Sequence, residues 1–186
     1  MSAADDRARL LALLTARSFK KQKVVLSSGK ESDFYIDCKK TVLTAEGHAL
    51  VGASLFREIL EKTPNVVGVG GLTMGADPIA SSVALVSHQQ KHPLDAFYVR
   101  KEPKGHGTGQ WIEGLTSFQP GAKVAIVEDV VTTGASTIKA IERARSEGLD
   151  PVAAFALVDR DEGGREAIEK TGVKVHALFK RGDFPS

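Results

Sequence analysis

The chain has 186 residues, of which 42% are hydrophobic, and its 25 Lys and Arg nearly balance its 23 Asp and Glu. This length and composition fit one domain, 1–186, with its own core, and the balanced charge gives no reason to expect a nucleic-acid or membrane partner. The lone Cys38 excludes an internal disulfide, and the opening MSAADDRARLLALL has acids where a secretory signal carries basic residues. These features predict a cytoplasmic protein.

The first third of the chain shows helical spacing on both sides of a hairpin pattern. Leucines at near-helical intervals predict an amphipathic helix over 5–17. The following segment, KVVLSSGKESDFYIDCKK, has two short β-like runs around a Ser-Gly-Lys turn, which predicts a hairpin. Val51, Leu55 and Ile59 recur at i, i+4 spacing, so we expect a second helix over 44–62.

After Pro64, short β-branched runs alternate with helical segments, which is typical of an α/β fold with a central parallel sheet flanked by helices. The expected strands are 65–71, 94–100, 122–129, 152–159 and 174–179. The expected helices are 79–86, 135–146 and 165–170.

The stretch 100–120 breaks this alternation. It combines repeated glycines with Arg100, Lys101, Lys104 and His106, and we expect no core residues from it. A long loop inside a compact domain is more often a functional lid than filler, with disorder as the alternative.

The segment KVAIVEDVVTTGASTIKAIERA predicts an anion-binding turn. An apolar strand ends in two acids, passes through small residues and enters a helix. Backbone N–H groups of Thr132, Thr133, Gly134, Ala135 and Ser136 can converge there on a phosphate, because the N-terminus of a helix favours negative charge. Glycine permits the tight turn, and the hydroxyl groups add donors.

Glu128 and Asp129 stand at the carboxyl end of the same strand, the edge where ligands bind in open α/β sheets. Two acids beside a phosphate would repel it unless they face other groups. Sugar hydroxyls or a hydrated Mg²⁺ satisfy them. The alternative is an acidic strand end followed by an ordinary helix cap.

These residues resemble a known family. VEDVVTTGAST resembles the phosphoribosyl pyrophosphate (PRPP) signature of type I phosphoribosyltransferases. SSGKESDFYIDCKK and YVRKEPKGHGTGQWIEG resemble the base-side hairpin and the mobile catalytic loop of the orotate phosphoribosyltransferase family. The resemblance implies a type I phosphoribosyltransferase fold, with a small hood-like N-terminal subdomain (1–43), an α/β core (44–186) and a mobile loop over 101–115.

The implied reaction is pentosyl transfer from PRPP to orotate, giving orotidine 5′-monophosphate and pyrophosphate in pyrimidine biosynthesis. By resemblance, the catalytic residues are Lys104, His106 and Asp129. The turn 132–136 would grip the 5-phosphate, and Glu128 and Asp129 would hold the ribose hydroxyls. The pyrophosphate would be bound by Arg100, Lys101, Lys104 and His106.

The resemblance assigns the orotate carboxylate to Arg160, which follows a predicted core strand, and a further base contact to Thr132. A guanidinium can bind a carboxylate through two parallel hydrogen bonds. Phe34 and Tyr35 are candidates to cover the ring, with core packing as the alternative. For Arg160 the alternative is a surface ion pair with Asp159 or Asp161.

The resemblance also implies a homodimer whose loops reach into each other's sites, and Mg²⁺ held mainly through PRPP and water, with no certain protein ligand. Ser27 and Met74 depart from the pattern, since several family members have lysines there. The scattered histidines lack ligand spacing and are interpreted as structural: His48, His88, His92 and His176.

Two other activities remain open. The first is phosphoribosyl transfer to another nucleobase, which would keep the PRPP turn and change the base pocket. The second is a PRPP-sensing regulator without catalysis, although the cationic loop argues against it. A dehydrogenase is disfavoured because no strand is followed by the G-x-G-x-x-G pattern with a suitably placed acid.

Overall fold

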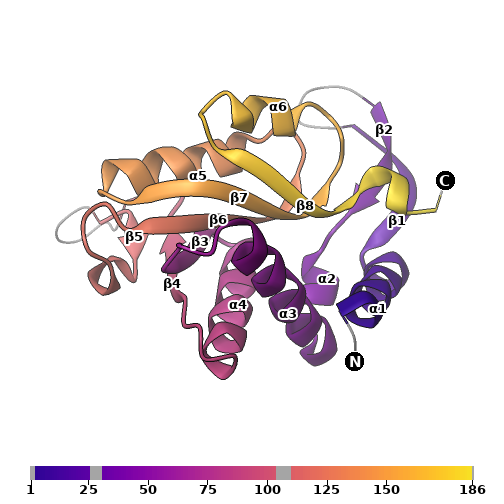
Figure 1. Ribbon diagram of the computed structural model, residues 1–186. Helices are drawn as coiled ribbons and strands as arrows, with labels where there is room; N and C mark the ends of the chain where they lie inside the picture. The colour runs from indigo at the N-terminus through magenta and orange to yellow at the C-terminus, as the bar shows by residue number, and fades with distance from the viewer. Residues whose placement is uncertain (1–2, 26–30, 104–109, 186) are drawn as a thin grey trace.

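The computed structural model describes residues 3–25, 31–103 and 110–185. Its centre is a six-stranded sheet with strand order β5-β4-β3-β6-β7-β8, in which every neighbouring pair is parallel except β4 and β5 (Figure 1). The prediction of an α/β fold with a mostly parallel sheet is confirmed. The strands are β3 (Gly68–Leu72), β4 (Asp95–Val99), β5 (Ile112–Glu113), β6 (Lys123–Val131), β7 (Asp150–Asp159) and β8 (Lys174–Lys180).

Helices cover both faces of the sheet. Figure 1 shows α3 (Ala45–Lys62) and α4 (Asp77–Gln89) on one face, and α5 (Ala135–Ser146) and α6 (Gly164–Glu169) on the other. Each face has its own buried apolar cluster. The expected i, i+4 face of α3 is buried in the first cluster, and Ile141 of α5 is buried in the second. Thr44 begins α3 as its N-cap, since its Oγ1 accepts a hydrogen bond from the backbone N–H of Gly47 at 3.1 Å.

The N-terminal segment comprises α1 (Ala3–Arg17), the antiparallel strands β1 (Phe19–Val25) and β2 (Glu31–Ile36), and the short α2 (Lys39–Val42). β1 and β2 form a sheet separate from the central one. Leu10 and Leu14 of α1 are nevertheless fully buried in the same apolar cluster as α3 and α4. This segment therefore shares the main core, and its division as a hood at residue 43 stays a prediction.

The chain ends against the hairpin. After β8, a 3₁₀ turn, η2 (Arg181–Asp183), brings Phe184 into contact with the rings of Phe19 and Phe34, at centroid distances of 5.6 and 5.4 Å. The C-terminal segment and the hairpin, far apart in sequence, thus lie side by side (Figure 1).

The expectation that 100–120 supplies no core residues is wrong for its second half. Ile112 pairs with Val99 at the edge of the sheet and is fully buried. Beyond β5 and the 3₁₀ turn η1 (Leu115–Ser117), Phe118 packs edge-on against Phe97 at 5.7 Å. Without β5, β4 would be the edge of the sheet with unpaired backbone groups, which explains why a glycine-rich segment pairs with it.

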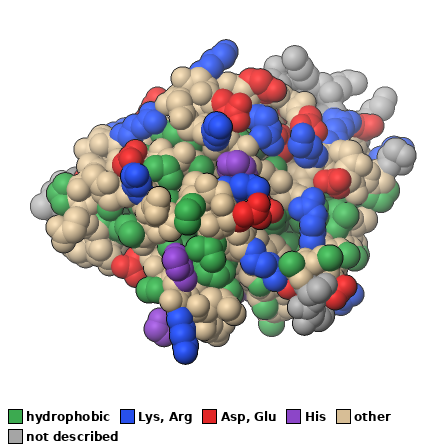
Figure 2. Space-filling model, viewed as in Figure 1, with side chains coloured by type: hydrophobic (Ala, Val, Ile, Leu, Met, Phe, Trp, Pro, Cys, Tyr) green, Lys and Arg blue, Asp and Glu red, His purple; other side chains and the backbone are tan. Residues whose placement is uncertain are grey.

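No helix among the described residues is long and apolar enough to cross a membrane. On the face drawn in Figure 2, acidic and basic side chains are interspersed over the surface.

Candidate active site

The residues expected to bind a phosphate surround one pocket. β6 ends at Val131, and the chain turns through Thr132 and Thr133 into α5. The pocket has a volume of about 280 Å³. Its lining residues are Glu128, Val130, Val131, Thr132, Thr133, Gly134, Ala135, Ser136 and Thr137.

The N-terminus of α5 suits an anion. Its N-cap is Gly134, with a φ of 81°, and no side chain caps the helix. The first N–H groups of a helix have no partners within the helix, so here they are available to a ligand, and the helix dipole adds to the attraction. Thr133 Oγ1 lies 3.5 Å from the backbone N of Ala135, too long to act as a strong cap.

The turn packs backbone against backbone on the start of α6. A Cβ at Gly134 would lie 2.7 Å from the carbonyl O of Gly164, and a Cβ at Gly164 would lie 2.5 Å from the carbonyl O of Thr132. Real Cβ atoms do not come this close to backbone atoms, so both positions require glycine. Gly164 therefore helps to fix the turn, although the sequence pattern gave no reason to assign it to the site.

Glu128 is buried rather than open to the pocket's mouth. Its side chain is 7% exposed, and its Oε2 accepts a hydrogen bond from Thr137 Oγ1 of α5 at 3.1 Å. Burial, followed by the neighbouring Asp129 carboxylate, raises the pKa of Glu128 to about 8. Glu128 thus links the strand end to the helix, and its role toward ribose stays a prediction.

Asp129 faces a different set of neighbours. Its Oδ1 accepts from the backbone N–H of Val130 at 2.9 Å, and its Oδ2 lies 3.8 Å from Lys39 Nζ of α2. A Cβ at Gly75, in the turn between β3 and α4, would lie 2.7 Å from Asp129 Oδ1. That turn, which contains a cis peptide bond between Thr73 and Met74, therefore lies directly against the carboxylate.

The cationic segment, Arg100 to His106, is described as far as residue 103, and its start lies at the same edge of the sheet as the phosphate turn. Arg100 Nε pairs with Glu113 Oε1 at 3.0 Å, and the backbone N–H of Arg100 donates to the carbonyl of Trp111. Lys139 Nζ of α5 donates to the carbonyl O of Lys101 at 2.8 Å, which ties the start of the segment to the helix. Lys104 and His106 lie outside the described residues, as does Ser27.

Arg160 follows β7 immediately beside the turn, since its backbone N–H donates to the carbonyl O of Val131 at 3.0 Å. The prediction that both lie on one edge of the sheet is confirmed. The side chain is buried, and its Nη2 contacts Glu162 Oε1 at 2.9 Å and the carbonyl O of Phe34 at 2.8 Å. The alternative of a surface pair with Asp159 or Asp161 is wrong, because Asp159 is paired with Arg165 and the partner of Arg160 is Glu162.

Comparison with known proteins identifies the family. No family model matches the chain. The orotate phosphoribosyltransferase of Sorangium cellulosum is 53% identical, covering 97% of this chain and 94% of the relative, and that of Aquifex aeolicus is 47% identical, covering 96% and 97%. The chain belongs to the orotate phosphoribosyltransferase family.

Solved structures of orotate phosphoribosyltransferases and related enzymes have the same fold. The Mycobacterium tuberculosis orotate phosphoribosyltransferase in complex with PRPP has a TM-score of 0.76 and 35% identity, covering 96% of this chain and 98% of that one. A phosphoribosyltransferase from Corynebacterium diphtheriae has a TM-score of 0.81 and 35% identity, with the same coverage. The type I phosphoribosyltransferase fold expected from the resemblance is thus confirmed.

The two aromatic residues assigned to the base differ in placement. Phe34 is 4% exposed and packs 5.1 Å from Phe19, so core packing accounts for its burial. Tyr35, on the other side of the strand, is 37% exposed. That Phe34 and Tyr35 contact orotate stays a prediction.

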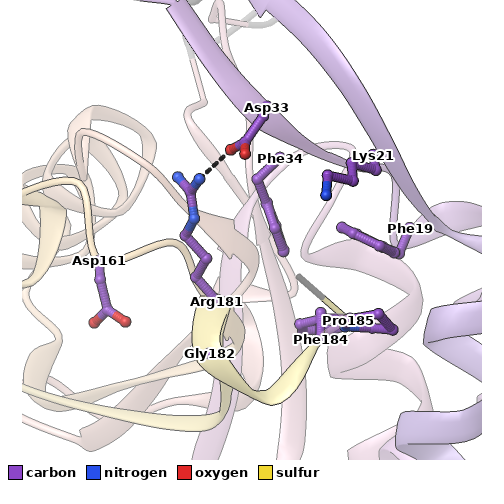
Figure 3. Close-up of a pocket in the computed structure, with 9 residues that line it drawn as sticks. All are labelled: Phe19, Lys21, Asp33, Phe34, Asp161, Arg181, Gly182, Phe184 and Pro185. Carbon is purple, nitrogen blue, oxygen red and sulfur yellow. Dashed lines mark hydrogen bonds and ion pairs between the residues drawn. The ribbon is translucent and has the colours of Figure 1, made fainter.

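An ionic chain joins the base side to the C-terminal segment. Arg181 pairs with Asp33 of the hairpin, and its Nη1 lies 3.9 Å from the Glu162 carboxylate that holds Arg160. Figure 3 shows the Arg181–Asp33 pair at the wall of a pocket of about 440 Å³, with Phe34 beside it. The guanidinium carbons of Arg160 and Arg181 both lie 5.6 Å from the centre of the Phe34 ring. Glu162 and Asp33 thus offset two cations gathered around one ring.

Proposed function

We propose that the protein transfers the 5-phosphoribosyl group of PRPP to orotate, giving orotidine 5′-monophosphate and pyrophosphate in pyrimidine biosynthesis. Curated relatives at 53% and 47% identity over nearly the whole chain are named orotate phosphoribosyltransferase. The structural observation that carries the proposal is the uncapped N-terminus of α5, which opens into a pocket lined by the whole turn from Thr132 to Ser136.

The turn binds the 5-phosphate and so anchors the sugar at the carboxyl end of β6. Asp129 then lies within reach of the ribose, on the side of the strand that faces the β3–α4 turn. As pyrophosphate leaves C1, positive charge develops on the ring, and a fixed carboxylate stabilises it more than the ground state. The buried Glu128 supports this edge through Thr137.

The leaving pyrophosphate gains negative charge, which the cationic segment stabilises. Arg100 and Lys101 begin this segment at the sheet edge, and Lys104 and His106 continue it in the sequence. When the segment covers the site it also excludes water, which would otherwise hydrolyse PRPP. Lys104 and His106 are the proposed catalytic residues of the segment, together with Asp129 on the sugar side.

Orotate binds beside the turn, with its carboxylate on Arg160. The Arg160 guanidinium is already oriented by Glu162 and by the Phe34 carbonyl, which leaves it little freedom to lose on binding. Thr132 contacts the base from the phosphate turn, and Phe34 and Tyr35 approach from the hairpin.

Mg²⁺ is the proposed cofactor. Among the described residues there is no group of three or more His, Cys, Asp or Glu side chains placed to hold a metal. Mg²⁺ usually keeps several waters and binds through one or two carboxylates plus substrate phosphates, and the Asp129 carboxylate at this edge fits that pattern. Bound there, the ion would neutralise charge on the pyrophosphate.

The predicted loop 101–115 ends earlier than expected, because Ile112 and Glu113 pair with β4 of their own chain. We further propose a homodimer in which the part of this loop that precedes β5 in each subunit covers the site of the other, and a cytoplasmic location. Both rest on the family resemblance and on the sequence features described above. Transfer to a different nucleobase would use the same turn and remains the competing activity.

One assay tests the proposal. Purified protein should deplete orotate, followed by its ultraviolet absorbance, only with both PRPP and Mg²⁺ present. Adenine, hypoxanthine and uracil in place of orotate should give far less turnover. Arg160→Ala should chiefly raise the KM for orotate. Faster turnover of another base, or PRPP binding without turnover, would instead identify the competing transferase or the PRPP-sensing regulator.

A further inference from the structure

Lys39 reaches the sugar-side carboxylate from a distant part of the chain. It is the first residue of α2, and its Nζ lies 3.1 Å from Asp37 Oδ1 and 3.8 Å from Asp129 Oδ2. The Lys39 side chain is 45% exposed, whereas that of Asp129 is only 15% exposed. The ammonium group therefore sits at the rim of the site with its charge directed at a mostly buried acid.

The Lys39 ammonium is shared by two carboxylates. Its Nζ contacts Asp37 Oδ1 at 3.1 Å as well as Asp129 Oδ2 at 3.8 Å. Within the described part of the chain, Lys39 is the only basic side chain within ion-pair distance of Asp129. Burial acts to lower the pKa of Lys39, but the hydrogen bond to Asp37 and the charges of Asp129 and Asp37 together raise it above its ordinary value. The side chain is thus a cation at neutral pH.

Without Lys39, the carboxylates of Asp129 and Asp37 would repel a ligand that carries several phosphate charges. The loss of Lys39 would also remove one of the contacts that hold the Asp129 side chain, which among the described residues further meets Val130 N–H, the adjacent Gly75 and Glu128. Lys39 both offsets negative charge and contacts the Asp129 side chain, and the Asp37 carboxylate in turn holds the Lys39 ammonium.

We propose that Lys39 is a positioning residue of the sugar site, which holds the Asp129 carboxylate in place and offsets part of the negative charge at this edge so that the polyanionic phosphosugar can bind. This inference rests on the proposed function, since it assigns Lys39 to the PRPP side of that site. The proposed role of Lys39 therefore concerns PRPP binding and not orotate binding, which involves Arg160 and Glu162 on the base side of the site.

The test compares Lys39→Met, which keeps the length and removes the charge, with Lys39→Arg, which keeps the charge. Lys39→Met should raise the KM for PRPP by roughly tenfold, equivalent to about 1.4 kcal/mol, and leave the KM for orotate nearly unchanged. Lys39→Arg should retain most of the PRPP affinity.

Lys40→Met is the matched control, since Lys40 is exposed and has no ion pair among the described residues. It should behave like the wild type. Equal changes in both KM values for Lys39→Met, or a lower melting temperature with an unchanged KM for PRPP, would overturn the role of Lys39. Direct titration of PRPP into each variant by calorimetry separates this result from failure of the proposed function, because it needs no turnover of orotate.

Discussion

The backbone of Gly134 lies directly against that of Gly164, so that the phosphate turn is fixed by the start of α6 as well as by its own sequence. A Cβ on Gly134 would lie 2.7 Å from the Gly164 carbonyl O, and one on Gly164 would lie 2.9 Å from the Gly134 N. The pocket at α5 therefore depends on a close approach between two loops.

Gly164→Ala should push the turn out of position. Overpacking of this kind typically costs about 1–3 kcal/mol, and here it should also raise the KM for PRPP because the N–H groups no longer converge. Urea unfolding and steady-state kinetics measure the two effects.

Gly134→Ala adds the strain of a left-handed backbone to the same packing conflict. Gly148→Ala is the control, because Gly148 has a φ of 83° with open space around it. Equal losses in Gly134→Ala and Gly148→Ala would contradict the packing argument.

Gly75→Ala should damage catalysis more than folding. The added Cβ would meet the end of the Asp129 side chain, 2.7 Å from Oδ1, and that side chain can rotate away. A displacement of about 1 Å at a reacting centre can lower turnover by roughly 10²-fold. We therefore expect a melting temperature close to that of the wild type and a much lower kcat. Gly182→Ala, where nothing lies within 4 Å of the added atom, serves as control. A normal kcat for Gly75→Ala would show that Asp129 is not held against this turn during the reaction.

These glycines show where sequence reasoning stops. The turn, its acids and the order of strands follow from local patterns, because an apolar run, a small-residue turn and helical spacing each reside in a few consecutive residues. Gly75, Gly164 and Lys39 act through contacts with residues 30 or more positions away, and no local pattern indicates those contacts. Lys39 lies in the segment SSGKESDFYIDCKK, yet only the position of the short α2, which no local pattern predicts, brings it to Asp129.

The segment 100–120 departs from the predicted loop for a related reason. Its glycines and charges suggested a loop throughout, but Ile112 is buried because the edge of β4 is available for pairing. Similarly, Glu162 was not singled out, since two nearer acids, Asp159 and Asp161, were the obvious partners for Arg160. Asp159 points to Arg165 instead, at 3.0 Å. Which of three neighbouring acids meets a given arginine depends on side-chain direction after the strand ends.

Glu128 should make stability depend on pH. Its ordinary pKa of 4.5 is raised to about 8 in the folded protein, first by burial and then by Asp129. Between these values the folded state binds more protons than the unfolded state, so the free energy of unfolding falls as the pH rises, by up to roughly 1.4 kcal/mol per pH unit. The contribution of Glu128 to the free energy of unfolding is complete below pH 4.5 and is lost as the pH rises through 8.

Glu128→Gln keeps the shape and the acceptor for Thr137 but cannot ionise. The variant should therefore lose less stability than the wild type between pH 5 and pH 8, a range set by those two pKa values. Calorimetric melting at each pH measures the difference. Parallel pH profiles for the two proteins would show that Glu128 does not titrate in this range.

The two ion pairs beside Phe34 should differ greatly in their contribution to stability. Arg160 and Glu162 have side chains that are 8% and 17% exposed, whereas Arg181 and Asp33 are 39% and 57% exposed. Glu162→Ala removes the carboxylate that pairs with the buried Arg160 guanidinium and should cost about 3–5 kcal/mol. Asp33→Ala removes an exposed pair and should cost about 0–1 kcal/mol. Urea unfolding of both variants provides the comparison, and similar losses would refute the assignment of Glu162 as the buried partner of Arg160.

A dimer with shared loops makes a prediction that no monomer can satisfy. Lys104→Ala should inactivate the loop of a subunit, and Arg160→Ala should inactivate the base side of the site that the subunit keeps. If each site combines the loop of one subunit with the core of the other, a mixed dimer has one site with both defects and one intact site. Random mixing of equal amounts should then restore about a quarter of the wild-type sites, half of the dimers being mixed. The measurement is turnover, at an orotate concentration well below the KM of Arg160→Ala, after the two variants are unfolded and refolded together, with each refolded alone as the control. If the loop instead served its own subunit, every site in the mixture would keep one defect, and turnover would stay at the level of the separate variants.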